Sequence, residues 1–235
     1  MTGPGRPRLV ERRRPGASGR EEILDAAGEL FVTRGFAATS TRAIAESVGI
    51  RQASLYHHFP TKESILAALL DSTVEPSLHY ARTLADLGGD PSVLLWALTA
   101  GDSWNLLTDR SNLGRLYLIP EADAPGLAVF HAKRRELHGI YRTLAARTVS
   151  DPNDPRCGLP VRVTESVIAI RADDPAITAP ADGPLPTSAR LLADSSLRIL
   201  GLEPTGTLRD AGTALVASHR RPPRAVGDSS RHPRG

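Results

Sequence analysis

Two short helical patterns that meet at Gly49 constrain the fold of this chain more than any other stretch. The first follows Ser40, a good N-cap residue, and has one apolar face. Gly49 can adopt the left-handed conformation that ends a helix. The second pattern covers residues 51–59 and stops at Pro60, which cannot continue a helix. Two short helices joined in this way predict a helix-turn-helix, whose second helix can enter a DNA major groove.

The same stretch carries a run of residue types in a fixed register. They are Gly35-Phe36, Thr39-Ser40, Ile44-Ala45, Gly49-Ile50, Leu55-Tyr56-His57-His58-Phe59 and Lys62-Glu63. In these positions the chain resembles the TetR family of bacterial transcriptional regulators, over roughly residues 20–66. One position departs from the family pattern, because Arg51 stands where Ser or Thr usually caps the recognition helix. Arg51 cannot cap, which costs helix stability, and its charge could instead add a DNA contact.

The resemblance implies an all-α homodimer with an N-terminal three-helix DNA-binding unit and a C-terminal helical regulatory and dimerisation domain. It implies a cytoplasmic transcriptional regulator, usually a repressor that a small molecule releases from a palindromic operator of double-stranded DNA. An activator or a ligand-independent regulator of the same fold is the alternative within this class. The alternative from another class is an enzyme that uses a cavity among the middle helices. We expect no catalysis, no metal and no cofactor, since Cys157 has no His near it in sequence.

The candidate DNA contacts come from this resemblance and from side-chain chemistry. Arg42 has the fork of donors that matches guanine, and Gln52 can pair with adenine. Hydroxyl and basic side chains suit phosphates, which fix register without reading sequence. Some of the set could instead be solvated or cap helices. The predicted contacts are Thr41, Arg42, Arg51, Gln52, Ser54, Tyr56, His57, His58 and Lys62.

The net charge of +3 hides an uneven distribution. Residues 1–20 hold six Arg and one Glu, and residues 219–235 hold five Arg and one Asp, so the ends carry +5 and +4 and the remainder carries 3 − 9 = −6. We expect a disordered basic arm (1–19), a DNA-binding domain (20–66), a ligand-binding and dimerisation domain (67–219) and a disordered basic tail (220–235). The arm either contacts phosphates or is simply solvated, whereas solvation is favoured for the tail.

Other global features narrow the class of protein. A single Cys excludes internal disulfides and suits a reducing cytoplasm. No apolar run is long enough for a membrane span, and the N-terminus lacks the apolar segment of a secretory signal. Residues 161–171 could be a strand, but their apolar spacing favours a helix. Residues 172–186 hold four Pro and one Gly, and we expect them to be mobile.

The middle of the chain holds the aromatic residues that could surround a ligand. An apolar pocket with a few convergent polar groups is the usual form of a ligand site, although ordinary core packing is the alternative for each residue. The candidate ligand contacts are Trp96, Trp104, Tyr117, Phe130, His131 and Tyr141, with Asp102, Asn105, Arg115 and His138 as further polar possibilities.

Two rows of small and aliphatic residues in the later part of the chain, called stripes below, are the candidate dimer interface. They lie within residues 161–171 and 187–200, and two copies of both helices would make the four-helix bundle that the resemblance implies. The alternative is that the stripes close the core of the single chain. The predicted interface residues are Val163, Val167, Ile170, Ala189, Leu192, Ala193, Ser196, Leu197 and Leu200.

Overall fold

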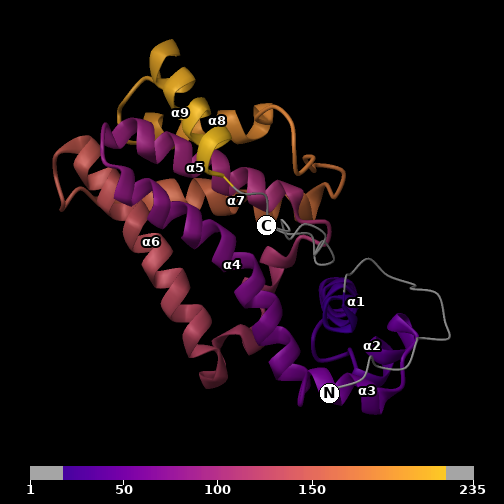
Figure 1. Ribbon diagram of the computed structural model, residues 1–235. Coiled ribbons are helices and arrows are strands. Elements are labelled where there is room, and N and C mark those ends of the chain that lie inside the picture. Colours follow the sequence, from indigo (N-terminus) through magenta and orange to yellow (C-terminus); the bar gives the residue numbers. More distant parts are fainter. Residues whose placement is uncertain (1–17, 221–235) are drawn as a thin grey trace, which may run out of the picture. The chain divides into compact units, whose positions relative to one another are not determined.

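The structure is a computed structural model, and it describes residues 18–220 (Figure 1). These residues form α-helices and short 3-10 helices with no strand among them, so the expected all-α class is confirmed. They divide into two compact units, residues 18–65 and residues 66–220. The division falls inside one long helix, α4 (Lys62–Leu87). The predicted basic arm and tail lie outside the described residues, apart from Ser18, Gly19 and Arg220.

The first unit contains three complete helices and the start of α4. The complete helices are α1 (Gly19–Arg34), α2 (Thr41–Val48) and α3 (Gln52–His58).

Local signals in the sequence set the ends of these helices. Ser18 and Glu21 form a capping box at the start of α1, each side chain accepting from the backbone N–H of the other residue. The Ser40 hydroxyl accepts from an N–H of α2, and Gly49 ends that helix at a φ of 77°. Arg51 is the N-cap of α3 without a side-chain hydrogen bond, as its chemistry predicts.

A small apolar core joins the three helices. Ile23 of α1, Ile44 of α2 and Leu55 of α3 are each 0% exposed, and Phe59 closes the core behind α3. The rings of Phe31 and Phe36 meet edge to face at 5.0 Å. Leu55 is the only buried residue of α3, so this helix depends on one anchor and leaves its other side chains outside.

The second unit holds the rest of α4 and all later helices. No helix in the described part of the chain is long and apolar enough to cross a membrane. Its elements after α4 are α5 (Pro91–Thr108), η1 (Leu113–Leu118), η2 (Pro120–Asp123), η3 (Pro125–Leu127), α6 (Ala128–Val149), η4 (Pro155–Gly158), α7 (Leu159–Asp173), α8 (Thr187–Ile199) and α9 (Gly206–His219).

Helix α5 is the centre of the second unit. It packs against α6, α7, α8 and α9, and almost every residue from Leu94 to Asn105 is buried (Figure 1). The approach of α9 is close, since a Cβ built on Gly212 would lie 2.3 Å from the ring of Trp96. An alanine there would force the indole to move. Residues 161–171, ambiguous in the sequence, form the helix that their apolar spacing favours, because they lie within α7.

The structure corrects the predicted dimer stripes. Five of their residues are buried inside the single chain, so they cannot form the surface between two copies; these are Ala189, Ala193, Ser196, Leu197 and Leu200. Val167 is also buried, at 1% exposure. The hydroxyl of Ser196 meets that of Thr99 on α5, which shows that this face of α8 covers α5. Leu192 and Val163 are half-buried, and Ile170 is exposed.

The structure also corrects the expectations for residues 172–186 and for Arg220. Apart from Ala172 and Asp173, which end α7, the segment has no helix or strand, but Ala179 donates its N–H to the Leu107 carbonyl and Pro180 accepts from the Trp104 indole. Hydrogen bonds therefore hold the Pro-rich segment against α5. Arg220, expected in a disordered tail, is 9% exposed and belongs to the folded unit.

Candidate nucleic-acid interface and regulatory centre

The polar side chains of α3 lie on its outer surface. Arg51, Gln52, Ser54, His57 and His58 are all exposed. Tyr56 is 46% exposed although it is a large aromatic residue. Since Leu55 and Phe59 take the inward positions, the spacing that predicted a helix-turn-helix also separates the anchors from the predicted contacts.

A hydrogen-bonded group links α2 to α3 on this surface. The Thr41 and Tyr56 hydroxyl oxygens are 3.0 Å apart, and the Gln52 amide donates to Thr41 Oγ1 at 2.9 Å. The same amide lies 3.4 Å from the Tyr56 hydroxyl. Three of the predicted contacts therefore hold one another in place before any DNA is bound.

Lys62 has a structural role that the sequence did not indicate. Its ammonium donates to the carbonyls of Phe36 and Thr39, at 2.8 and 3.0 Å. It also lies 4.1 Å from the centre of the Phe36 ring, a cation–π distance. Lys62 thus ties the start of α4 to the loop before α2, and two of its three donors are occupied. Its predicted role as a simple phosphate contact is revised accordingly.

An open hollow lies between the start of α2 and the start of α4. Ser40, Thr41, Tyr56, Thr61 and Lys62 are among the residues that line it. The N-terminus of a helix offers free N–H groups and a positive dipole end, and α2 presents its own to this hollow. Hydroxyl groups, a helix N-terminus and an ammonium together suit a phosphate.

Arg42 stands apart from this group. Its Nε donates to Glu46 Oε1 at 2.8 Å, one turn further along α2. The two side chains are 77% and 64% exposed, so the guanidinium is accessible from solvent but already has a partner.

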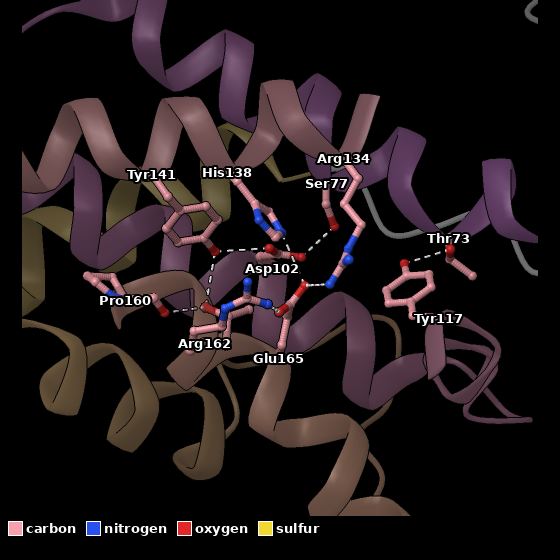
Figure 2. Close-up of polar contacts among 11 residues, drawn as sticks. Thr73, Ser77, Asp102, Tyr117, Arg134, His138, Tyr141, Pro160, Arg162 and Glu165 are labelled. Carbon is pink, nitrogen blue, oxygen red and sulfur yellow. Dashed lines mark hydrogen bonds and ion pairs between the residues drawn. The ribbon is translucent and has the colours of Figure 1, made fainter. Parts of the chain in front are cut away.

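Asp102 is a buried carboxylate in the middle of the second unit (Figure 2). Ser77 of α4 donates to its Oδ1 at 2.5 Å, and Tyr141 of α6 donates to its Oδ2 at 2.9 Å. The Tyr141 hydroxyl also meets Thr164 of α7 at 3.1 Å. Burial raises the pKa of Asp102 to about 6, although the two hydrogen bonds act in the opposite direction. Four helices therefore meet at one carboxyl group that has no direct ion pair among the described residues.

A second carboxylate beside this centre has several cationic partners. Glu165 accepts from Arg134 at 2.5 Å, His138 at 3.1 Å and Arg162 at 2.6 Å (Figure 2). Partial burial alone would raise the pKa of Glu165, but the hydrogen bond from His138 and the charge of Arg134 lower it to about 2. Glu165 therefore stays ionised down to a much lower pH than Asp102 does.

The predicted ligand residues belong to several different groups of contacts. Tyr117, Phe130 and His131 form one aromatic group. The ring centres of Tyr117 and Phe130 are 5.4 Å apart, and those of Phe130 and His131 are 5.3 Å apart. The Tyr117 hydroxyl donates to Thr73 of α4 at 2.7 Å, while Arg134 lies 5.1 Å from its ring. Tyr141 belongs to the Asp102 centre.

The two tryptophans have other surroundings. Trp96 is fully buried and donates to Asp194 of α8 at 2.9 Å, and Trp104 contacts the 172–186 segment and Arg220. Among the further polar candidates, Asn105 joins Arg220, His138 joins Glu165, and Arg115 is exposed on η1.

Sequence reasoning missed several members of the buried polar groups. His138 was named as a candidate, and Arg134 lies four residues before it on α6, so helical spacing alone could have added Arg134. Their partner Glu165 lies on a different helix, and no local pattern indicates that pairing. Ser77, Thr73 and Thr164 carry no signal either, because hydroxyl residues are common on helices.

Comparisons with known proteins agree with this arrangement. A family model described as "Bacterial regulatory proteins, tetR family" matches residues 23–69. The crystal structure of Mycobacterium smegmatis AmtR is 43% identical to this chain with a TM-score of 0.79, and the match covers 91% of this chain and 100% of that one. The chain belongs to the TetR family. The resemblance seen in the sequence is confirmed.

Two further matches are shorter or more distant than this one. The HTH-type transcriptional repressor KstR2 of Rhodococcus jostii is 42% identical over 84 residues, which is 35% of this chain and 41% of that protein. The match thus spans about two fifths of this curated relative. The crystal structure of AibR in complex with isovaleryl coenzyme A and operator DNA is 21% identical with a TM-score of 0.56, covering 79% of this chain and 98% of that one. This last similarity shows the fold alone.

Proposed function

We propose that the protein is a transcriptional repressor that binds a palindromic DNA operator as a homodimer and leaves it when a small molecule binds the second unit. The observation that carries the proposal is α3, a helix held by the single buried anchor Leu55 with all its polar side chains outside. The full-length similarity to AmtR and the name of the KstR2 relative support the same class.

In this proposal Gln52 and Arg42 read bases, because their side chains can form the paired hydrogen bonds that distinguish adenine and guanine. His57, Ser54 and Arg51 are exposed on α3 and available for further contacts. A backbone phosphate occupies the hollow beside Thr41 and Tyr56. His58 adds a second backbone contact. Phosphate contacts fix the register in which the reading side chains act.

The proposed dimer uses apolar residues that the single chain leaves exposed. Leu159 and Ile170 of α7 are each 42% exposed, and Leu191 and Ile199 of α8 are 56% and 36% exposed. Val163 lies between the first two on the same face of α7. Isolated apolar residues are common on surfaces, but two such rows on neighbouring helices favour a partner. A second copy would place two recognition helices on successive major grooves, about 34–36 Å apart.

The proposed effector acts through the Asp102 centre and α4. Ser77 and Thr73 of α4 bond to Asp102 and to Tyr117, and Pro76 lies between them. A proline lacks the N–H that would bond to the Ser72 carbonyl, so the helix bends more easily here. A small molecule that displaces either bond would move this part of α4, which begins at Lys62 in the DNA-binding unit. Catalysis has no role in this scheme.

Selection of bound sequences from a random double-stranded DNA library tests the DNA-binding proposal. We expect enrichment of a palindrome whose half-sites are about one helical turn apart. Placed before a reporter gene, this operator should lower transcription when the protein is present, whereas an activator would raise it. Failure to enrich any palindrome would contradict the proposal.

Charge substitution in the exposed rows tests the dimer. Ile170→Glu and Leu191→Glu should give helical monomers that lose operator binding, as measured by light scattering and fluorescence anisotropy. Ala169→Glu is the matched control, because Ala169 is also exposed on α7 and adjoins Ile170 without belonging to the row. If both variants remain dimers, the interface is elsewhere.

A further inference from the structure

Arg220, directly after α9, is a buried guanidinium in the second unit. Its Nε donates to Asn105 Oδ1 of α5 at 2.9 Å, and its Nη1 donates to the Ala181 carbonyl at 3.0 Å. The guanidinium carbon lies 3.8 Å from the centre of the Trp104 ring, which gives a flat stack of cation on indole. Arg220 is 9% exposed and Asn105 is 6% exposed.

Two hydrogen-bond donors in this group have no acceptor among the described residues. They are Arg220 Nη2 and Asn105 Nδ2, both buried. The orientation of the amide is settled, since Oδ1 must face Arg220 Nε to accept its proton. The two free donors therefore belong to one bonded pair of side chains. An unsatisfied buried donor is unfavourable, and a cationic one more so.

The charge of Arg220 also lacks a partner. No carboxylate of the described residues forms an ion pair with it, and Asp182, whose charge acts on it from a distance, is exposed. Burial lowers the pKa of Arg220 to about 10, which reflects this environment. Asn105 and Ala181 accept from its Nε and Nη1, and Trp104 lies against its guanidinium.

Several hydrogen bonds hold the backbone segments around this group in place. Arg171 donates to the Ile177 carbonyl at 3.0 Å and to the Leu106 carbonyl at 2.7 Å, so it bridges the 172–186 segment and the end of α5. Ala179 and Pro180 add the two contacts described above. The free donors thus lie among α5, the end of α9 and a segment that is fixed at several points.

We propose that Arg220 and Asn105 bind a small carboxylate, and that Trp104 supplies the flat wall of this site. A water molecule could accept from both donors, but it would leave the buried positive charge without a counter-charge. A carboxylate supplies two acceptor oxygens and one negative charge, and it matches the edge of a guanidinium. A single cationic side chain suits a singly charged planar anion better than a phosphate.

Thermal unfolding in sodium acetate tests the site, with sodium chloride at equal ionic strength as the reference. Acetate should raise the Tm of the full chain above its value in chloride by about 2 °C or more, because it binds the folded state alone. Arg220→Met should abolish this difference. Arg147→Met is the matched control, since Arg147 is exposed on α6, and it should keep the difference.

Asn105→Asp makes the test independent of any loss of folding in Arg220→Met. The new carboxylate would itself accept from Nε and Nη2 of Arg220, so this variant should be at least as stable as the wild type in chloride and insensitive to acetate. Equal Tm values for the wild type in acetate and chloride would mean that the donors hold only water, and would overturn the proposal. An acetate effect that survives in Asn105→Asp would place the binding elsewhere and overturn it too.

Discussion

The two units of this protein place their candidate polar residues in opposite ways, although the first unit also buries Glu22 and Thr39. In the first unit the predicted contacts are outside, on α3 and at the start of α2, around a core of apolar residues. In the second unit Asp102, Arg171, Arg220 and Asp194 are inside, each less than 10% exposed. Water satisfies the hydrogen bonds of an exposed polar group, so it needs no partner in the free protein. A buried polar group must find its hydrogen bonds within the fold or with a ligand.

This difference determines which substitutions should destabilise each unit. The first unit depends on a few apolar anchors, and its polar surface can change without loss of folding. In the second unit a polar residue such as Asp102 connects four helices. A substitution there changes both the polar contacts of the site and the stability of the fold. Substitutions of buried and of exposed residues in the two units test this comparison.

Leu55→Ala should have the largest effect. Removing a fully buried anchor from a seven-residue helix should cost about 2–5 kcal/mol of unfolding free energy. The first unit should then unfold and operator binding should be lost, while most of the helical circular dichroism remains because the second unit is intact. Ser54→Ala, an exposed change on the same helix, should leave unfolding unchanged. Retention of operator affinity by Leu55→Ala would contradict the anchoring role.

The sequence predicted the first unit well because its signals are local. The capping box at Ser18, the left-handed Gly49 and the spacing of Leu55 and Phe59 each act within a few residues. The second unit was harder. Its helix positions followed from apolar spacing, but the inward face of α8 was mistaken for a dimer surface. A stripe of small residues looks the same whether it faces its own α5 or a second chain.

Asp102→Asn tests the buried side of the comparison. Because the folded-state pKa of Asp102 is about 6, above its unfolded value of 3.8, the folded state binds the proton more tightly. This stabilisation is complete below about pH 3.8 and is lost as the pH rises to about 6, by up to about 3 kcal/mol. Asp102→Asn has no carboxyl group to ionise at this position, so it should not lose stability in this way. The variant should therefore be more stable than the wild type at pH 8.

Denaturant unfolding between pH 4 and pH 8 would measure this effect. The exposed carboxylates of the chain also titrate, so the relevant quantity is the difference between the wild type and the variant at each pH. One of the two hydroxyls, Ser77 or Tyr141, can still donate to the amide oxygen, while the other can turn its proton away and accept from the amide N–H, and the fold should therefore tolerate the change. A difference that does not vary with pH would show that Asp102 is ionised throughout.

Gln52→Ala tests the exposed side of the comparison. Loss of a paired contact to adenine should cost about 1–3 kcal/mol of discrimination at one base pair, with little change in nonspecific affinity. The unfolding free energy should change little, because Gln52 is exposed. Tyr56→Phe is the contrasting variant, since loss of the hydroxyl should weaken binding to all sequences alike. Equal losses on all sequences for Gln52→Ala would assign it to the phosphate backbone.

The candidate sites divide in the same way as the fold. The exposure of candidate contacts such as Gln52 and Tyr56 could be predicted from sequence, because the helix face is enough, whereas their contacts with DNA stay predictions. The bonds of Lys62 to Phe36 and Thr39 could not be predicted, since they depend on a loop more than twenty residues away, and its phosphate contact stays a prediction. Arg220 was assigned to a tail, because its partner Asn105 is 115 residues distant in sequence.

The smallest effect on stability is expected for Glu46→Gln. Glu46 pairs with Arg42 one turn away on α2, and both side chains are largely exposed, so water and salt screen the pair. The unfolding free energy should fall only slightly. DNA binding should change more, because the carboxylate competes with guanine for Arg42 and repels nearby phosphates. We therefore expect tighter operator binding and a steeper dependence of affinity on salt, measured by anisotropy across a salt series. Weaker operator binding would mean instead that Glu46 holds Arg42 in the orientation that reads the base, as Thr41 and Tyr56 do for Gln52. The exposed surface of the first unit would then be as preorganised as the buried centre of the second.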